Sequence, residues 1–269
     1  MTTSILSAGR QLHEAPERGS MTGFGTLLRK ELGFWWSTRR WWVHTLLWLG
    51  LMNGFMVPVY FVVQAHPEAG LDLLDQLTKL FFTLGGTTVA IGAIVVGQDA
   101  IISERQLGTA AWILSKPVAR TAFLLAKFVA QVVSFTVLAV GIQAAVAYGQ
   151  IALLEGTLLA PIPYLMAVGL ICVNLLFYIA LVLMLGTLFR TRSQVLLVAL
   201  GWLFASPLLV VDMVPWLTNV VPFGLPDIGA ALTMGMPLAD VPLRPVALAL
   251  IWTVAFLAVA IRRFGHEEL

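Results

Sequence analysis

Charged side chains are scarce in this chain of 269 residues, since Asp, Glu, Lys and Arg together make up 11% of it. Soluble domains carry about 25% of such residues. Hydrophobic residues reach 59% and the mean hydropathy is +0.91, so the chain is not a soluble globular protein. Segments of about ten residues with alternating polarity, typical of membrane β-barrels, are also missing. The sequence therefore predicts an all-α membrane protein.

Several motifs of common enzyme sites are absent as well. The single cysteine, Cys172, excludes an intrachain disulfide and a cysteine-based zinc site. The chain has no G-x-x-x-x-G-K-[ST] phosphate loop, no H-E-x-x-H and no G-x-S-x-G. A shared metal site is disfavoured because the four histidines are scattered near expected span ends: His13, His44, His66 and His266. We expect no metal, no cofactor, no nucleic-acid partner and no enzymatic activity in this chain.

Six apolar segments are long enough to cross the hydrocarbon of a bilayer, which takes about 17–25 helical residues. The first should kink at Asn53, Gly54 and Pro58. Between the fifth and sixth, residues 216–243 are rich in proline, and we expect short helices that dip into the outer leaflet. The six expected spans are residues 41–63, 80–102, 121–149, 164–188, 195–214 and 245–261, the last being the shortest.

Basic residues predict the orientation. All of the 16 Lys and Arg residues except Lys79 and Arg244 fall on one side of this six-span arrangement. Cytoplasmic loops carry such an excess, so both termini should be cytoplasmic in a multi-pass protein of the inner (cytoplasmic) membrane. Residues 1–20 lack the apolar core of a secretory signal and are expected to form a disordered cytoplasmic tail. The start could be Met1 or Met21, and residues 21–269 would form one membrane domain.

Residues 24–40 predict an amphipathic helix. Its apolar residues recur at helical spacing, with basic residues mostly off that stripe. Five of the nine tryptophans fall between Trp35 and Trp48, as an aromatic belt at the membrane surface predicts. A helix lying in the headgroup plane is favoured over one that packs on a soluble partner. Its candidate residues are Arg29, Lys30, Glu31, Trp35 and Trp36.

Few ionisable residues lie within the expected spans. Asp99 and Asp212 fall near span ends, and Lys127 is close enough to an end for its side chain to snorkel to the headgroups. No ionisable residue sits clearly at mid-membrane, where ion-coupled carriers place their charges. The second span also carries small residues at helical spacing, which allow close helix packing within one chain or, less favoured, between two copies. These are Gly86, Ala90, Ala93 and Gly97.

A polar island, residues 99–120, separates the second and third spans. Ser103-x-x-Gln106 has the form of a capping box, which predicts the start of a short helix. Apolar residues continue at helical spacing to Leu114, and Pro117 ends the helix. Thr121 would cap the third span. We expect a short cytoplasmic helix over 104–114 that fills a groove on a partner, the alternative being a loop lying on headgroups.

The island also resembles a known family. Ile102-Ser-Glu-Arg-Gln-Leu-Gly-Thr109, Leu114-Ser-Lys-Pro-Val-Ala-Arg120 and Ala126-Lys127 are similar to the "I-S-x-E-R-x-x-G-T … L-L-S-x-P-V-S-R … G-K" stretch of type-2 ABC transporter permeases, including those of nitrous-oxide-reductase maturation. Ala119 and Ala126 depart from the usual Ser and Gly. The layout of spans is similar as well. The family's substrates also include drugs, lipids and polysaccharides, and the sequence selects none of these.

The resemblance implies an exporter-type permease that pairs with a second copy or a homologous permease. A separate ABC ATPase subunit would bind ATP and Mg²⁺ and drive the permease. It would contact the short coupling helix and the N-terminal amphipathic helix. The residues implied in coupling are Ser103, Glu104, Arg105, Gly108, Thr109, Leu114, Pro117 and Arg120.

Two other functions stay open at this stage: an ion-coupled secondary carrier, and a membrane anchor that recruits a soluble partner without transport. The energy source distinguishes the two transporter classes. An ABC permease complex in sealed vesicles should transport only with ATP and should be insensitive to an ionophore. Transport that an ionophore abolishes and that ignores ATP would support the carrier instead. A P-loop ATPase reading frame beside the gene would favour the permease.

Overall fold

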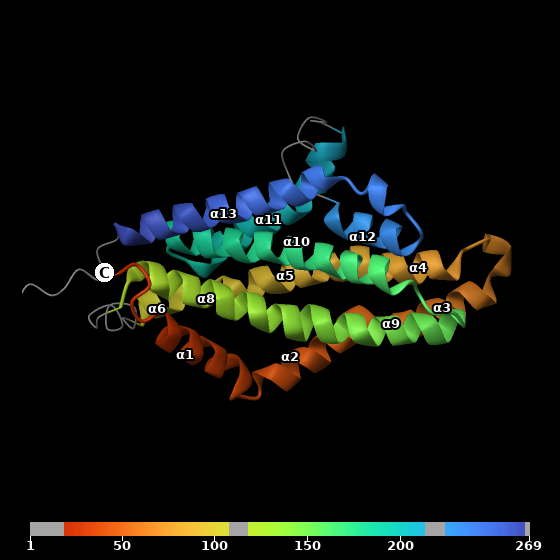
Figure 1. The fold of residues 1–269 in the computed structure, drawn as a ribbon, viewed down its shortest axis with the longest axis horizontal. Coiled ribbons are helices and arrows are strands. Elements are labelled where there is room, and N and C mark those ends of the chain that lie inside the picture. The colour runs from red at the N-terminus through yellow and green to blue at the C-terminus, as the bar shows by residue number, and fades with distance from the viewer. Residues whose placement is uncertain (1–18, 108–117, 213–223, 267–269) are drawn as a thin grey trace, which may run out of the picture.

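The computed structural model describes residues 19–107, 118–212 and 224–266, and every regular element in these ranges is a helix. Most of the predicted tail, residues 1–20, therefore lies outside the described residues. Five helical stretches are long and apolar enough to cross a membrane. Their helices run lengthwise through the bundle of Figure 1. The five stretches are Arg40–Ala65, Leu73–Gln106, Arg120–Glu155, Pro161–Leu188 and Leu243–Gly265.

The predicted span at residues 195–214 corresponds to α11 (Arg192–Asp212). Its apolar part with described side chains, Arg192–Phe204, is shorter than a span. The structure thus bears out an all-helical membrane fold with five candidate spans, and the sixth span stays a prediction.

Each of the five helical stretches is longer than the predicted span that it contains. The second begins at α4 (Leu73–Lys79), because Asp72 caps the helix by accepting from the Leu74 amide at 3.1 Å. Lys79 does not mark the start of the span. It lies inside the helix, and its ammonium pairs with Asp75 one turn back at 2.8 Å. The last span, α13 (Leu243–Gly265), is longer than predicted, but it is the shortest of the five candidate spans within the described residues, as the sequence predicts. Arg262 and Arg263 lie in its final turn, where positive charges interact favourably with the negative end of the helix dipole.

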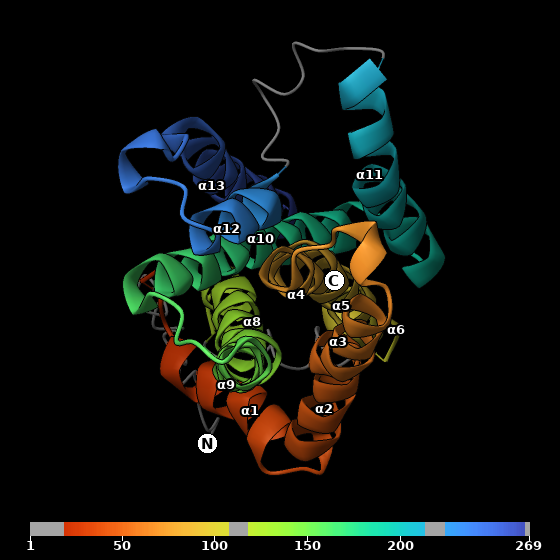
Figure 2. The same cartoon turned by 90° about the vertical axis from the view of Figure 1, so that its right-hand side faces the viewer.

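Helix α10 (Pro161–Leu188) is the centre of the fold. It contacts α13, α12 (Leu225–Thr233), α5 (Gly85–Gly97) and α8 (Arg120–Phe135). Figure 2 shows α10 crossing the middle of the molecule, with α12 and α13 on one side and α5 and α8 on the other. Apart from Asn174, its middle is largely apolar and buried, as expected of a helix surrounded by other helices.

Part of the predicted outer connection, residues 216–243, is helical. Helix α12 and a 3-10 turn at Leu238–Asp240 lie in it, and α12 packs on α10 and on the second span. Gly86 makes this approach possible, because a Cβ there would meet the ring of Pro226 on α12. Gly97 likewise faces Val182 of α10. All four small residues, Gly86, Ala90, Ala93 and Gly97, are buried by other helices of the same chain.

Three successive spans each contain a π-helical segment. These are η1 (Leu49–Asn53) between α2 (Arg40–Trp48) and α3 (Met56–Ala65), η3 (Leu80–Leu84) between α4 and α5, and η4 (Thr136–Gly141) between α8 and α9 (Ile142–Glu155). The break that the sequence predicts near Asn53 and Gly54 falls at the end of η1. Such bulges leave backbone carbonyls without their regular helical donors.

A buried amide pair supplies the missing donors. Gln143 Nε2 donates to the carbonyls of Leu138, at 3.0 Å, and Thr45, at 3.2 Å. Asn53 Nδ2 donates to Gln143 Oε1 at 3.0 Å. Both amides are buried, at 1% and 0% exposure. They therefore join the first span to the third inside the bundle, where no water is present to satisfy polar groups.

We predict that Gln143→Leu destabilises the protein by about 1–3 kcal/mol, because it removes the donor to the Leu138 and Thr45 carbonyls and the side-chain acceptor of the Asn53 amide. The measurement is the midpoint of unfolding of the purified protein in a detergent titration. Gln150→Leu is the matched control on the same helix, since the Gln150 side-chain oxygen has no partner within the described ranges. Equal midpoints for the two variants would contradict the role given to Gln143.

Candidate functional site

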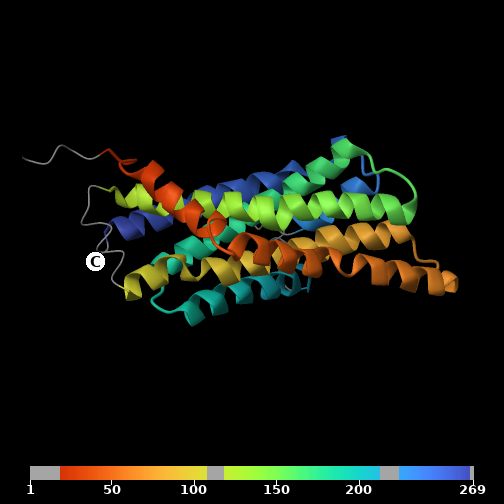
Figure 3. The same ribbon diagram turned by 90° about the horizontal axis from the view of Figure 1, so that it is seen from below.

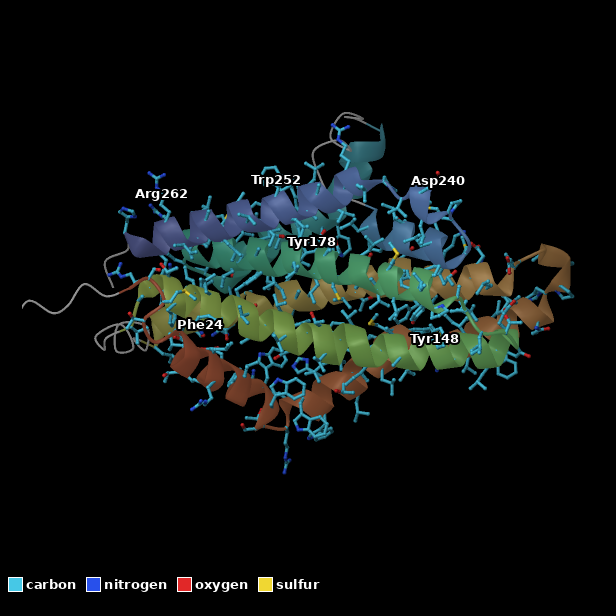
Figure 4. The ribbon with its side chains drawn as sticks, in the orientation of Figure 1. Phe24, Tyr148, Tyr178, Asp240, Trp252 and Arg262 are labelled. Atoms are coloured by element: carbon cyan, nitrogen blue, oxygen red, sulfur yellow. The ribbon has the colours of Figure 1, made fainter. Side chains whose placement is uncertain are left out.

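Most of the predicted site residues that the structure describes lie at one end of the bundle. We call this the basic end; it carries the beginnings of α1 (Phe24–Trp36) and α8 and the last turns of α10 and α13. Figure 4 shows Phe24 and Arg262 at this end and Tyr148 and Asp240 at the opposite one. Four coupling residues implied by the resemblance, Gly108, Thr109, Leu114 and Pro117, lie outside the described residues.

The capping box at Ser103 is not formed, so that prediction was wrong. Ser103 lies inside α6 (Asp99–Gln106), and its Oγ donates to the Asp99 carbonyl at 2.6 Å. An N-cap needs a non-helical residue, whereas here the chain continues as a helix from α5 through Gln98. In the helix interior a serine bonds instead to the carbonyl four residues back. Glu104 therefore sits in the last turn of the second span.

Lys127 is the centre of a charge cluster. Its ammonium lies 2.7 Å from Glu104 Oε1 on α6 and 3.1 Å from Glu31 Oε1 on α1. The Lys30 ammonium is 3.5 Å from the same Glu104 oxygen. The Lys127 side chain is 5% exposed and that of Glu104 is 14% exposed. We name Lys30, Glu31, Glu104 and Lys127 the lysine cluster; it joins α1, α6 and α8.

The predicted snorkelling of Lys127 was therefore wrong. The side chain does not extend to the surface, because two carboxylates from other helices neutralise it inside the protein. The Phe123 ring, whose centroid is 5.0 Å from the ammonium, adds a cation–π contact. Sequence inspection singled out Glu31, Glu104 and Lys127 separately. It missed their pairing because they lie on three elements that only the fold brings together.

Arg105 binds the C-terminal end of α10. Its guanidinium donates to the carbonyls of Gly186 at 2.9 Å, Thr187 at 3.2 Å and Phe189 at 3.3 Å. The last carbonyls of a helix lack intrahelical donors, and a cation there also opposes the helix dipole. Glu104 and Arg105, adjacent in sequence, thus tie α6 in two directions, to α1 and α8 and to α10.

Arg120 makes the same kind of contact with the last span. It donates to the carbonyls of Phe264 at 3.2 Å and Gly265 at 2.9 Å, at the end of α13. The predicted cap at Thr121 was wrong, since Ala119 is the N-cap of α8 and no side chain caps it. A further ion pair joins Asp99 of α6 to Arg192 at the start of α11, with 2.8 Å between Oδ1 and Nε.

The N-terminal amphipathic helix is shorter than predicted. Helix α1 ends at Trp36, and Arg40 already begins the first span. Leu27 and Trp35 are buried, whereas Arg29, Lys30 and Trp36 are exposed. The α1 helix crosses α8 obliquely in Figure 3, and the two helices are in contact. The apolar stripe of α1 thus packs at least partly on its own chain.

Metal ligands are not gathered anywhere in the described ranges, where no three His, Cys, Asp or Glu residues lie close enough together to hold an ion. The basic end therefore offers ion pairs and helix-end contacts.

The profile of a family described as "ABC-2 family transporter protein" matches residues 26–224 of the chain. The matched part runs from α1 through α11 and contains the lysine cluster and Arg105. No curated protein matches the sequence.

We predict that Lys127→Met destabilises the protein by about 3–5 kcal/mol, because the largely buried Glu31 and Glu104 would lose their close cation and keep only the more distant, exposed Lys30. Glu104→Gln combined with Lys127→Met should recover part of that loss. A double-mutant cycle on unfolding midpoints in detergent measures the coupling. Strictly additive effects of the two substitutions would show that Lys127 and Glu104 do not interact in the folded protein.

Proposed function

Because this chain belongs to the ABC-2 family of transporter proteins, we propose that its basic end couples the membrane helices to ATP hydrolysis by a separate ABC ATPase subunit. The chain is a multi-pass membrane protein and a permease component of an ABC transporter. The observation that carries the proposal is the position of Glu104 and Arg105 at the end of α6, each bound to a different set of helices.

The proposed mechanism follows from these contacts. ATP binding would move the ATPase subunits, and the displacement would reach the permease at the polar island. Glu104 would pass it to α1 and α8 through Lys127, and Arg105 would pass it to α10 through the three carbonyls. Packed helices move as rigid bodies, so a shift of α6 at one end would reposition the spans.

This mechanism changes the role proposed for two residues. Glu104 and Arg105 bind helices of their own chain, so we assign them to force transmission. The surface that meets the ATPase is proposed to be the motif that follows: Gly108, Thr109, Leu114 and Pro117. Arg29 and Trp36, exposed on α1, would add to that surface.

The remaining parts of the proposal come from charge and family resemblance. The basic end would face the cytoplasm in the inner membrane, and a reporter fused after Leu269 that is active only outside the cytoplasm should stay silent. ATP and Mg²⁺ would bind the ATPase. Two permease copies, or one copy and a homologue, would form the pathway, which the mass of the purified complex tests. The branch serving nitrous-oxide-reductase maturation is the first to examine for substrate.

The coupling assignment is tested with Arg105→Gln in the complex of permease and ATPase. The ATPase should still co-purify, but stimulation of its ATP hydrolysis by the permease should fall about tenfold, within the usual range of coupling free energies. Arg190→Gln is the matched control, because Arg190 is an exposed arginine just beyond the end of α10. Full stimulation in Arg105→Gln would refute the transmission role. Loss of co-purification would place Arg105 in the docking surface instead.

A further inference from the structure

A cavity of about 470 Å³ lies beside the lysine cluster. Its walls come from α1, the start of α2, the junction of α5 and α6, and α8. Figure 1 shows α1 and α2 meeting in a V, and the cavity lies between this V and the bundle. The lining mixes charges with the aromatic rings of Phe34 and Trp35, so it differs from the apolar grooves between helices elsewhere in the chain.

The charges that line this cavity are balanced in number, and four of them belong to the lysine cluster. Three are cationic, Lys30, Arg40 and Lys127, and three are anionic, Glu31, Asp99 and Glu104. Lys127 already forms short ion pairs with Glu31 and Glu104. Lys30 and Arg40 are therefore the cations of the α1–α2 wall. Asp99 and Glu104 are the anions of the α6 wall, and each also forms an ion pair through one carboxylate oxygen: Asp99 Oδ1 with Arg192 and Glu104 Oε1 with Lys127. A ligand that fits such walls carries a negative and a positive group a few ångströms apart.

The Arg40 guanidinium is positioned by an aromatic ring and can bind an anion. Its guanidinium carbon lies 3.6 Å from the centre of the Phe34 ring. The ion pairs found within the described ranges do not include Arg40. The Lys30 side chain, 54% exposed, reaches Glu104 only at 3.5 Å. Both cations can therefore bind a phosphate without breaking a short ion pair.

The surroundings indicate a lipid. Trp36, Trp41 and Trp42, which adjoin the lining residues Trp35 and Arg40 in sequence, are exposed, as tryptophans are at the level of membrane headgroups. Below them Leu46 and Leu47 of α2 are also exposed, with 57% and 51% of their surface free. An acyl chain can lie along this face of α2 while its headgroup enters the cavity.

We propose that this cavity binds the headgroup of a phosphatidylethanolamine molecule. The phosphate lies between Lys30 and Arg40, and the ammonium group faces Asp99 and Glu104. The bound lipid fills the space between the α1–α2 corner and α6. The site goes beyond the proposed function and does not depend on it, because lipid retention requires neither an ATPase nor transport.

The test is native mass spectrometry of the delipidated, purified permease after titration with phosphatidylethanolamine. The wild-type chain should retain one lipid, and Lys30→Gln with Arg40→Gln should bind it about tenfold more weakly. Arg29→Gln with Arg39→Gln is the matched control: it removes the same charge from adjacent positions that do not line the cavity. This control should retain the lipid as the wild type does.

Two further ligands and one further variant complete the test. Phosphatidylcholine should bind about tenfold more weakly, because its trimethylated nitrogen cannot donate hydrogen bonds to carboxylates. Soluble phosphoethanolamine should not bind at lipid concentrations; binding as tight as that of the lipid would mean that the site takes a soluble metabolite. Arg40→Gln alone should weaken retention while unfolding stays unchanged, because Arg40 is not part of the lysine cluster. Equal loss in the test and control pairs, or no retained lipid in the wild type, would overturn the proposal.

Discussion

The ammonium of Lys127 is the constraint on which the basic end depends. Burying an unpaired charge costs several kcal/mol, so a lysine that is 5% exposed requires carboxylates close by. Glu31 and Glu104 provide them from two other helices. Separating helix α1 from the bundle would therefore remove Glu31 from the buried Lys127 ammonium. A helix expected to lie in the headgroup plane thus also packs on α8 and forms an ion pair with it.

The two arginines of the polar island extend this arrangement to the other spans. Arg105 binds the end of α10 and Arg120 the end of α13, in both cases through carbonyls that the helix itself leaves unpaired. Helix ends in a membrane protein need such donors, because neither lipid nor neighbouring backbone provides them. As a result, Glu104, Arg105 and Arg120 together contact α1, α8, α10 and α13 through short hydrogen bonds and ion pairs. The described part of the island connects helices of its own chain, and the island also contains the segment proposed to meet the ATPase.

In the interior, by contrast, buried polar groups are satisfied by uncharged side chains. There Asn53 and Gln143 supply donors to carbonyls beside the π-helical segments. The spans are thus rigidly joined by ionic contacts at one end and joined by two amides nearer their middle. π-helical segments are common where helices bend or carry function. Their occurrence in three successive spans places irregular backbone between the basic end and the remainder of each span.

The sequence by itself determined the membrane class, the helical fold and the position of five spans, because long apolar runs can satisfy their backbone in lipid only as helices. It also located the polar island through its concentration of charge. The tertiary structure decided which charges meet. Ser103 could not cap a helix that was already running, and Lys127 found its carboxylates at positions 31 and 104. Local patterns do not encode these outcomes, since each depends on residues that only the packing of separate helices brings within hydrogen-bonding distance.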